Sequence, residues 1–593
     1  MKENLKSKKA TLEKVIISVA WPYANGDLHL GHPAGYLLPA SVLNDFLRLS
    51  GRDVIMVSGS DMHGTPIAVK AWKLKQEPQE LATAQHLNHL KVMKLLKLKY
   101  SLYTSTQTKL HSEITQTIFI KLLENGYIFK EKTNQYWSNI EKKFLLDRFI
   151  EGECPHCHYA LARGDQCDNC GRTLTPEELI NPHSIFGDKE LTLKSSTNYY
   201  LDLTKLQSLL KAHYKDIPEM GWRKHVVATT QSWLDEGLEP RAITRDMEGY
   251  GVSLPIGYEI PGEAGKVIYV WFEAVIGYLS ASVELSLRSG HENNILAGKV
   301  LNYNLESTAI ISDTYKGQSL NWEEYWFSPT TKSYYFMGKD NIPFHSIIWT
   351  AMLLGLNLNL NTPGNVVANQ YLNLKGAKFS KSTGNNIDTV KFWEKFGETS
   401  SRYYLLSRSP ENKDYDFTFS EFVAATNNEL GANVGNLVNR TLVFWNKQFA
   451  SSTHADVVTS PAISEKIKLT YEIVEKLLLE CNFVEALKEI LEFSSFGNRV
   501  FNDSQIWQVI KTDEQKAFQS MFDLLQIIAN LARLLLPFLP EFSEQIHSYL
   551  SLTLPVNEVG SNNWLPLTYL VSKLGLILNV QPLIKKLELS DEN

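Results

Sequence analysis

The sequence has little cysteine, no long apolar run and no surplus of positive charge. Only five cysteines occur among its 593 residues, and four fall in one short segment, which excludes a disulfide scaffold. No apolar run reaches the roughly 18 residues of a membrane helix, since the best candidate, 534–539, is broken by prolines. Lys and Arg number 59 against 65 for Asp and Glu, so nucleic acid cannot be held by bulk charge. The lysine-rich N-terminal segment lacks the apolar core of a secretory signal, and we expect a cytoplasmic protein.

The first part of the chain alternates short apolar runs with helical patterns. Residues 15–20 are apolar and rich in β-branched side chains, and they end at the turn formers of 22–26. Apolar residues then recur at helical spacing over 37–49 until Gly51, and a second buried strand is predicted over 53–57. Such a strand–helix–strand unit predicts a parallel sheet that binds ligands at the carboxyl ends of its strands.

This alternation is interrupted and then ends. From about 134 to 265, short strands and Gly/Pro turns indicate an inserted domain. Strand patterns return at 266–271 and 334–340, so the sheet is predicted to be split by the insertion. Beyond about 408 the strands disappear, and helical apolar spacing, as in 463–491, takes over. We therefore expect an α/β protein with a split Rossmann-type parallel sheet, followed by an all-α helical bundle.

Four of the cysteines form two closely spaced pairs. Cys154 and Cys157, and Cys167 and Cys170, are C-x2-C hooks separated by nine residues. They can supply four thiolates to a tetrahedral Zn²⁺, and a closed shell of this kind makes the metal structural. The inserted domain is thus predicted to contain a zinc knuckle. The alternatives for the four cysteines are a redox pair or four free thiols. Cys481 falls on an apolar helical face and is expected in the core.

The segment His29-Leu-Gly-His32 follows the first predicted strand. The i, i+3 spacing puts both imidazoles on one face near a helix N-terminus, where phosphate is favoured, and Gly31 lets a ligand approach the backbone. On its own, a motif of this kind more often marks surface histidines or a metal pair.

A second candidate lies far along the chain, at Lys378-Phe-Ser-Lys-Ser382. Two lysines three residues apart, with hydroxyl groups between flanking glycines, suit a mobile loop that closes on a polyphosphate. A solvated basic turn is the alternative for this segment alone.

Together, in this order and context, the two motifs resemble the paired signatures of class I aminoacyl-tRNA synthetases. The resemblance narrows to the methionyl-tRNA synthetase family and extends over about 15–540. The gap between the signatures leaves no room for the large editing domain of the isoleucine, valine and leucine members. The segments that carry the narrower resemblance are Ala20–His32, Asp61–Pro66, Trp271–Tyr278, Gly338–Asp340, Phe344-His345 and Lys378–Ser382.

The resemblance implies a methionine–tRNA ligase. Such an enzyme activates L-methionine with ATP to methionyl-adenylate and transfers it to the 3′ end of tRNA(Met), for translation initiation and elongation. It implies one structural Zn²⁺ on the four cysteines, Mg²⁺ with ATP, no membrane partner and a monomer. Two other classes stay open: a synthetase-derived ligase that charges a small molecule, and a non-enzymatic zinc-dependent RNA-binding protein.

The family motifs also assign roles to individual residues. Catalysis is assigned to His29, His32, Lys378 and Lys381. ATP binding is assigned to Tyr23, Asn25, Gly31, His32, Asp340, Ser380, Lys381 and Ser382. Methionine binding is assigned to Tyr23, Asp61, Trp271, Ala274, Tyr278 and His345, and anticodon binding to Asn436, Arg440 and Trp507.

Two residues depart from the family pattern, and both adjoin the methionine pocket. Trp21 stands where the family often has a smaller apolar residue, and Val275 replaces a common proline, which puts the volume of the pocket in doubt. The expected division of the chain is 1–133 and 266–355 for the two halves of the catalytic domain, 134–265 for the insertion, 356–408 for the region that contacts the tRNA stem, 409–550 for the anticodon-binding bundle and 551–593 for a C-terminal peptide.

Overall fold

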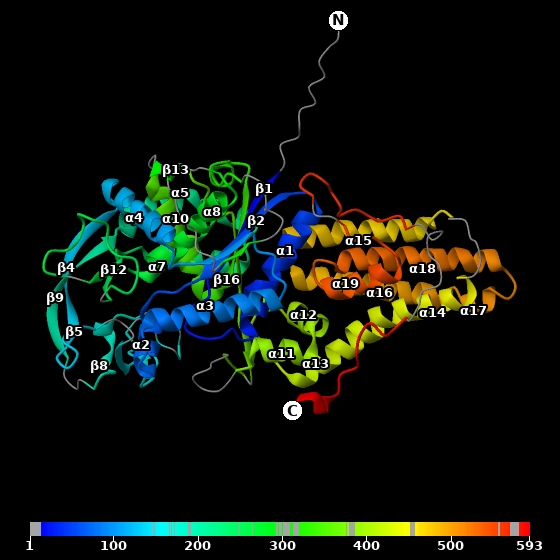
Figure 1. The fold of residues 1–593 in the computed structure, drawn as a ribbon, viewed down its shortest axis with the longest axis horizontal. Coiled ribbons are helices and arrows are strands. Elements are labelled where there is room, and N and C mark those ends of the chain that lie inside the picture. Colours follow the sequence, from blue (N-terminus) through cyan, green and yellow to red (C-terminus); the bar gives the residue numbers. More distant parts are fainter. Residues whose placement is uncertain are drawn as a thin grey trace, which may run out of the picture.

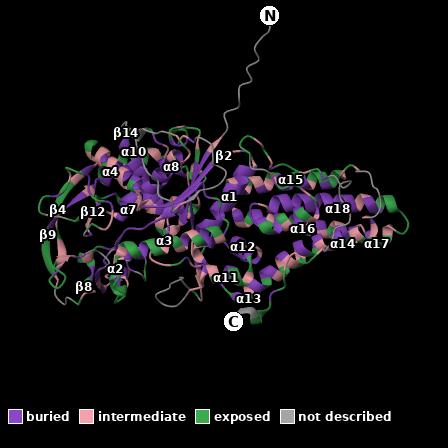
Figure 2. Ribbon diagram, viewed as in Figure 1, coloured by how far each residue is buried: buried purple, intermediate pink, exposed green. Residues whose placement is uncertain are grey.

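The structure is a computed structural model of the chain. It describes residues 13–145, 149–164, 167, 169–170, 172, 174–187, 191–247, 249–263, 265–291, 294–295, 299–300, 309–311, 320–374, 376–378, 386–450, 457–555, 558–569 and 580–592. An α/β part and a helical part lie end to end (Figure 1). Buried residues fill the main sheet and the inner faces of the long helices (Figure 2).

The α/β part is built on a six-stranded sheet in the order β15-β3-β2-β1-β16-β17. All neighbours in it are parallel except β15, which pairs antiparallel with β3. The strands β2 and β3 follow on one side of β1, and β17 follows on the other side of β16. Where the strand order changes direction in this way, between β1 and β16, α/β proteins bind ligands at the carboxyl ends of the strands. The strands are β1 (Lys14–Val19), β2 (Asp53–Ser60), β3 (Leu102–Ser105), β15 (Ile310–Ile311), β16 (Lys332–Gly338) and β17 (Asn365–Asn369). The predicted split parallel sheet is confirmed.

The helix predicted after the first strand is also confirmed, and it ends where expected. Gly51 closes it with a φ of 78°, a left-handed conformation that side chains rarely adopt. Every residue of this helix, α1, is buried, because it packs on β1 and β2 and also against helices of the bundle. The helices of the α/β part are η1 (Pro33–Leu37), α1 (Leu38–Leu49), α2 (Thr65–Leu74), α3 (Pro78–Leu95), α4 (Lys109–Glu124), α7 (Val270–Glu273), η5 (Ala274–Ile276), α8 (Gly277–Arg288), α9 (Glu323–Trp326), η7 (Lys339–Asn341), η8 (Phe344–Trp349) and α10 (Thr350–Leu356).

The prediction that 266–271 returns to the main sheet is wrong. Only β12 (Lys266–Ile268) is extended, and it pairs antiparallel with β11 (Thr244–Asp246) outside that sheet. The apolar residues after it form α7, because a short apolar run fits a buried helix as well as a buried strand. The stretch Val270–Arg288 is in fact long and apolar enough to cross a membrane by length and composition, which the sequence analysis missed. Since 83% of its most apolar window is buried inside the protein, it has the character of a core helix.

The insertion is rich in strands. The long antiparallel pair β4 and β9 organises one four-stranded sheet, and a three-stranded sheet carries the cysteines. Its strands are β4 (Ile128–Ser138), β5 (Lys143–Phe144), β6 (Ile150–Glu153), β7 (Ala162–Arg163), β8 (Ile180–Ser184), β9 (Thr192–Leu201) and β10 (Arg241–Ala242). Its helices are η3 (Pro176–Glu178), α5 (Leu203–His213), η4 (Ile217–Met220) and α6 (Lys224–Glu236), and β13 (Asn294–Ile295) and β14 (Lys299–Val300) follow α8.

The predicted helical bundle is confirmed, with two corrections. One short strand, β20 (Tyr415–Phe417), lies beyond 408 and pairs with β18. Cys481 is buried but lies in a turn, with a φ of 58°, rather than on a helical face. The remaining elements are β18 (Leu372–Leu374), β19 (Ala377–Lys378), α11 (Thr389–Phe396), α12 (Glu398–Ser407), α13 (Phe419–Ala424), η9 (Ala425–Gly435), α14 (Asn436–Gln448), α15 (Pro461–Leu479), α16 (Phe483–Asp503), α17 (Ile506–Val509), α18 (Glu514–Leu535), α19 (Pro540–Tyr549) and η11 (Leu589–Glu592).

A segment near the C-terminus connects the two parts. Trp564 is buried between Phe46 of α1 and Tyr471 of α15, with ring centroids 5.0 and 5.5 Å away. The backbone N–H of Asn563 donates to the carbonyl of Leu49 at 2.6 Å. Residues 563–564 are therefore packed against both the sheet-bearing part and the bundle.

Candidate active site

The first histidine signature lies directly after β1, at the start of η1. The rings of His29 and His32 are 4.1 Å apart between centroids. The N–H of Gly31 donates to His29 Nδ1 at 3.2 Å, which places the ring proton of His29 on Nε2, a possible donor to phosphate oxygen. His32 Nδ1 lies 3.2 Å from the N–H and 3.1 Å from the carbonyl oxygen of His29, so either tautomer of His32 finds a partner.

The second signature begins at β19, and the chain beyond it lies next to the first signature. Lys378 pairs with Asn373 of β18, while Ser380, Lys381 and Ser382 lie outside the described residues, as does the Lys378 side chain. At 387–389 the chain lies beside the histidine signature. The Leu30 N–H donates to the Ile387 carbonyl, and the Thr389 N–H donates to the Leu28 carbonyl, both at 3.3 Å. The histidine signature is thus joined by backbone hydrogen bonds to 387–389, a segment that lies a few residues beyond the second signature and more than 300 residues along the chain.

The carboxyl end of β16 supplies a third part of this crevice. Asp340 follows it in η7, and burial together with Asp340 raises the pKa of the Tyr371 hydroxyl. Lys339 pairs with Asp414 at 2.9 Å and lies over the Tyr371 ring. Asn25, in the turn after β1, accepts a hydrogen bond on its carbonyl from Lys70.

Asp61 stands at the carboxyl end of β2 and is almost fully buried. Its backbone bridges the turn after β1, since its N–H donates to Pro22 at 3.0 Å and its carbonyl accepts from Ala24 at 2.7 Å. This bridge pairs the backbone of Tyr23 with that of Asp61. Burial and the nearby charge of Glu273 raise the pKa of Asp61 well above its usual range. An ammonium group beside Asp61 would favour the ionised form instead.

Aromatic rings pack together around Trp271, next to the Tyr23 that pairs with Asp61. Trp271 stacks on Phe344, with centroids 4.0 Å apart and planes at 12°, and meets the Tyr23 ring edge-on at 5.7 Å. Ala274 follows on the next turn and is half-buried. Rings of this size provide an apolar, polarisable lining.

A buried hydrogen-bonded pair adds polarity to this lining. The Tyr278 hydroxyl lies 2.7 Å from His345 Nε2, and His345 Nδ1 lies 2.8 Å from the Asn341 carbonyl. Burial lowers the pKa of His345 to about 4, so the ring is neutral at pH 7. Because the carbonyl can only accept, Nδ1 carries the proton, and Nε2 accepts from the tyrosine.

The two departures from the family pattern have different surroundings. Val275 is buried in the core. The indole of Trp21 fits between two glycines, Gly59 of β2 and Gly277 of α8. A Cβ atom on Gly59 would lie 2.4 Å from the indole, and one on Gly277 would lie 2.8 Å from it. The larger residue is accommodated because both of its neighbours lack a side chain.

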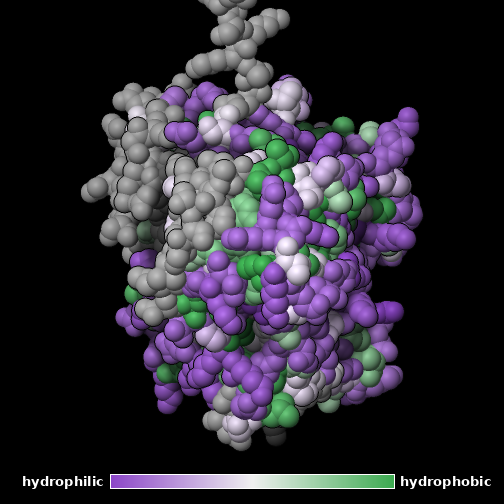
Figure 3. Space-filling model, turned by 90° about the vertical axis from the view of Figure 1, so that its right-hand side faces the viewer, coloured by the Kyte–Doolittle hydropathy of each residue, from purple (hydrophilic) through white to green (hydrophobic). Residues whose placement is uncertain are grey.

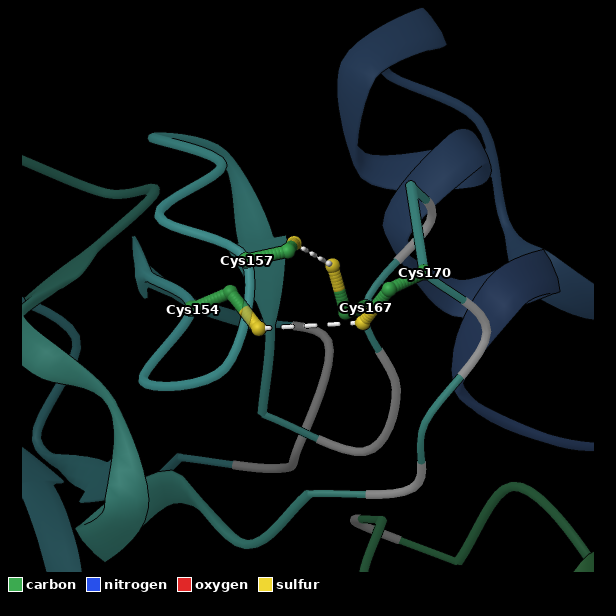
Figure 4. A group of neighbouring side chains, drawn as sticks. All are labelled: Cys154, Cys157, Cys167 and Cys170. Atoms are coloured by element: carbon green, nitrogen blue, oxygen red, sulfur yellow. Dashed lines mark hydrogen bonds between the residues drawn. The ribbon is translucent and has the colours of Figure 1, made fainter.

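The four cysteines converge as predicted (Figure 4). Their sulfur atoms lie within 4.8 Å of one another, with Cys154 and Cys170 at 3.9 Å and Cys157 and Cys167 at 3.5 Å. A tetrahedral Zn²⁺ with Zn–S bonds of about 2.3 Å requires sulfur atoms about 3.8 Å apart. The geometry fits one metal ion of this size.

The residues assigned to the anticodon lie on the bundle. Arg440 of α14 donates to Asn502 at 2.8 Å and lies 4.1 Å over the Phe501 ring, which in turn stacks on Trp507 at 5.9 Å. Trp507 is 41% exposed and so is not a core residue, and Asn436 is also exposed. The distal end of the bundle is mostly hydrophilic, with small apolar patches (Figure 3).

Comparisons with known proteins place this fold and site. A family model described as tRNA synthetases class I (M) matches residues 15–442, and the chain belongs to this family of class I tRNA synthetases. Methionine–tRNA ligases are its relatives. The enzyme of Roseiflexus sp. is 38% identical over 91% of this chain and 87% of its own length. That of Dehalococcoides mccartyi is 37% identical over 97% of each chain, and that of Pyrococcus furiosus is 37% identical over 91% of this chain and 72% of its own.

A solved structure has the same fold. It is the Mycobacterium tuberculosis methionyl-tRNA synthetase in complex with methionyl-adenylate. It covers 96% of this chain and 100% of its own, with a TM-score of 0.71 at 20% sequence identity.

The structure also brings residues to the site that sequence reasoning did not assign. Three of them, Phe344, His63 and Glu273, lie in motifs that carry the family resemblance. Their place in these motifs could have indicated that they lie near the site. His111 lies in α4 with no motif around it, and only the fold brings it to Glu273.

The Trp21 slot can be tested with Gly277→Ala. The atoms nearest to the new methyl group would be those of the Trp21 indole, so we expect the free energy of unfolding to fall by about 1–3 kcal/mol. In a Trp21→Leu background the same change should be neutral or stabilising, because alanine favours a helix. A double-mutant cycle followed by urea unfolding measures this coupling, with Gly35→Ala as a control, since nothing lies near a Cβ there. Equal effects of Gly277→Ala in both backgrounds would contradict the slot.

Proposed function

We propose that the chain is a methionine–tRNA ligase that forms methionyl-adenylate from L-methionine and ATP and charges tRNA(Met). The observation that carries this proposal is the backbone pairing of the histidine signature with 387–389, just beyond the second signature, at the carboxyl ends of the parallel strands, where Asp61 is buried. Membership of the family and 37–38% identity to methionine–tRNA ligases over most of the chain support it.

The first step joins the methionine carboxylate to the α-phosphorus of ATP. A carboxylate oxygen attacks that phosphorus, the bond to the β-phosphate oxygen breaks, and pyrophosphate leaves. We assign stabilisation of the phosphates to His29, His32, Lys378 and Lys381, because no protein nucleophile is needed and catalysis is positioning and charge stabilisation. Mg²⁺ would accompany the ATP phosphates. The remaining contacts to ATP are assigned to Tyr23, Asn25, Gly31, Asp340, Ser380 and Ser382.

The amino acid is assigned to the pocket beside Asp61. Its ammonium group would pair with the Asp61 carboxylate, and its thioether would lie among the aromatic rings. The lining residues in this assignment are Tyr23, Trp271, Ala274, Tyr278 and His345. Because His345 is neutral and its ring is hydrogen-bonded on both nitrogens, it gives the pocket polarity without net charge.

The second step transfers the methionyl group to tRNA. The 3′-terminal ribose hydroxyl attacks the acyl carbon, and AMP leaves with the electron pair of the broken acyl–phosphate bond. We assign the anticodon to Asn436, Arg440 and Trp507, since an exposed indole beside a guanidinium suits splayed loop bases.

The parts of the chain receive corresponding roles. We assign 1–133 and 266–355 to catalysis, 134–265 to the insertion, 356–408 to tRNA stem contact, 409–550 to anticodon binding and 551–593 to the C-terminal peptide. The protein is expected to act as a monomer in the cytoplasm, and size-exclusion chromatography coupled to light scattering tests the first of these expectations.

The four cysteines are assigned one structural Zn²⁺. The spacing of the sulfur atoms supports this metal, and four thiolates would leave no open position for a substrate. Its contribution would be to hold together a small segment that buries little apolar surface by itself.

The function is tested by ATP–pyrophosphate exchange with a panel of amino acids, followed by aminoacylation of tRNA(Met). We expect exchange with methionine and weaker exchange with ethionine, whose additional methylene should cost about 1–3 kcal/mol of transition-state binding in such a pocket. Charging of tRNA(Met) should follow. Exchange without charging would instead indicate a ligase for a small molecule, and no exchange with any amino acid would remove the proposal.

Two variants separate the two steps. Lys381→Ala should slow exchange by about 10²–10³-fold with methionine affinity nearly unchanged, because charge on the phosphates develops in that step. Trp507→Ala should leave exchange intact and weaken tRNA binding by about 1–3 kcal/mol, the worth of one stacked base. Equal damage to exchange and charging in the Trp507 variant would remove this residue from anticodon binding.

The metal assignment is tested by elemental analysis of the purified chain. We expect one zinc per chain, lost in Cys157→Ser and on treatment with a strong chelator, together with a lower unfolding temperature. Cys481→Ala is the matched control, because it removes a thiol distant from the cluster and should retain the metal. Full zinc content in the Cys157 variant would exclude that residue as a ligand.

A further inference from the structure

A buried arginine lies where three parts of the chain meet. Arg223 stands at the N-terminus of α6 in the insertion, and its side chain is only 8% exposed. Its Nη1 donates to the carbonyl of Ala368 at 3.0 Å and to the side-chain oxygen of Asn369, the last two residues of β17. Its Nη2 donates at 2.9 Å to the carbonyl of Cys481, in the turn between α15 and α16. One guanidinium group thus connects the insertion, the main sheet and the helical bundle.

A buried acidic side chain faces this arginine and binds the start of α16. Glu411 Oε1 lies 3.9 Å from Arg223 Nη2, and the Glu411 side chain is 6% exposed. The same oxygen accepts from the backbone N–H groups of Phe483 at 2.8 Å and Val484 at 3.1 Å, the first two residues of α16. Such groups have no partner within their own helix, and a helix N-terminus favours negative charge. Glu411 therefore caps α16 from another part of the chain.

The contacts continue from Asn369 to the histidine signature. Because the guanidinium group can only donate, Asn369 presents its oxygen to it and donates its amide N–H to the Ser409 hydroxyl at 3.1 Å. That hydroxyl in turn donates to the carbonyl of Ala34 at 2.9 Å, in η1 and two residues after His32. A continuous series of buried polar contacts therefore joins the start of α16 to the first signature. We define the junction network as Arg223, Asn369, Ser409 and Glu411.

Helix α16 extends from this junction to the far end of the bundle. It spans Phe483–Asp503 along the helical part (Figure 1) and is about 30 Å long at a rise of about 1.5 Å per residue. Near its distal end, Asn502 accepts a hydrogen bond from Arg440. The neighbouring Phe501 stacks on Trp507. A tilt of about 10° at the base would move that end by about 5 Å, so the place of the anticodon residues depends on how the start of α16 is held.

We propose that Arg223 and Glu411 are positioning residues for the charging of tRNA. They hold the start of α16 in one direction relative to the crevice, so that a tRNA bound by its anticodon presents its 3′ end to the methionyl group. Transfer requires both ends of one tRNA to be engaged together, and a fixed geometry between two sites favours such binding. Neither residue touches methionine, ATP or tRNA in this role. The inference rests on the proposed function, because it assumes that the anticodon and the 3′ end bind at the assigned places.

The test compares three measurements on the full chain in Arg223→Lys. Lysine keeps the charge but has one nitrogen on a flexible stem, so it cannot bridge Asn369 and Cys481 as the guanidinium group does. We expect kcat/KM for charging of tRNA(Met) to fall about 10–100-fold, since a misplacement of about 1 Å can cost a factor of this size. Methionine-dependent ATP–pyrophosphate exchange and binding of the isolated anticodon stem-loop should both stay close to wild type, because each uses only one end of the protein.

Glu411 provides a second test with a conservative counterpart. Glu411→Ala removes the acceptor at the start of α16 and should reproduce the selective loss of charging. Glu411→Gln retains an oxygen that can accept from the N–H groups of Phe483 and Val484, so it should recover most of the charging activity.

Arg48→Met is the matched control for a buried arginine. Arg48 donates to the Val54 carbonyl and to the Ser101 hydroxyl, both at 3.1 Å and both in the α/β part. Its replacement should lower the unfolding temperature without changing the ratio of charging to exchange. Rates are expressed per active site, titrated by the burst of adenylate formation, so that partial unfolding does not change the comparison.

Three results would overturn the inference. These are equal losses of exchange and charging in Arg223→Lys, a loss of stem-loop binding as large as the loss of charging, and wild-type charging in both Arg223→Lys and Glu411→Ala. If thermal unfolding shows that Glu411→Ala is not folded, Arg223→Lys decides. A wild-type protein that exchanges no methionine and charges no tRNA would remove the proposed function itself, a result distinct from wild-type charging in the variants of the junction network.

Discussion

Two backbone hydrogen bonds join distant parts of the chain at the candidate active site. They run between 28–30, in the connection that follows β1, and 387–389, at the start of α11, and these parts are separated in the sequence by the insertion. Since both bonds use main-chain atoms, they do not depend on which side chains occupy these positions. The pairing fixes the histidine signature relative to the start of α11.

The second feature of the site is how it compensates buried charge. Asp61 and Glu273 are both buried close to each other, and only the imidazoles of His63 and His111 lie close enough to Glu273 to form ion pairs among the described residues. His345, by contrast, is kept neutral by burial and is hydrogen-bonded on both ring nitrogens. The described residues thus include both a buried carboxylate group with imidazole partners and a neutral, hydrogen-bonded imidazole.

Much of this arrangement could be predicted from the sequence, where local patterns were strong. Residues 15–20, 37–49 and 53–57 have the spacing of buried strands and an amphipathic helix, and they form β1, α1 and β2. The cysteine pairs predicted a cluster because a C-x2-C spacing brings two thiols close together within one turn of the chain, so only the two pairs have to meet. The strand predicted over 266–271 is wrong because one apolar run there contains both a three-residue strand and the start of a buried helix. The helical position predicted for Cys481 is wrong because a turn interrupts the helical pattern at that residue. His111 gave no signal, because its meeting with Glu273 is created only by tertiary folding.

The fit of Trp21 between Gly59 and Gly277 has an evolutionary consequence. The indole is tolerable only where both neighbouring positions are glycine, so the histories of the three positions are bound by epistasis. An ancestor could have acquired the indole only after both glycines were in place, and a descendant could regain a side chain at Gly277 only after losing the tryptophan. Substitution at these sites is therefore expected to be ordered in time.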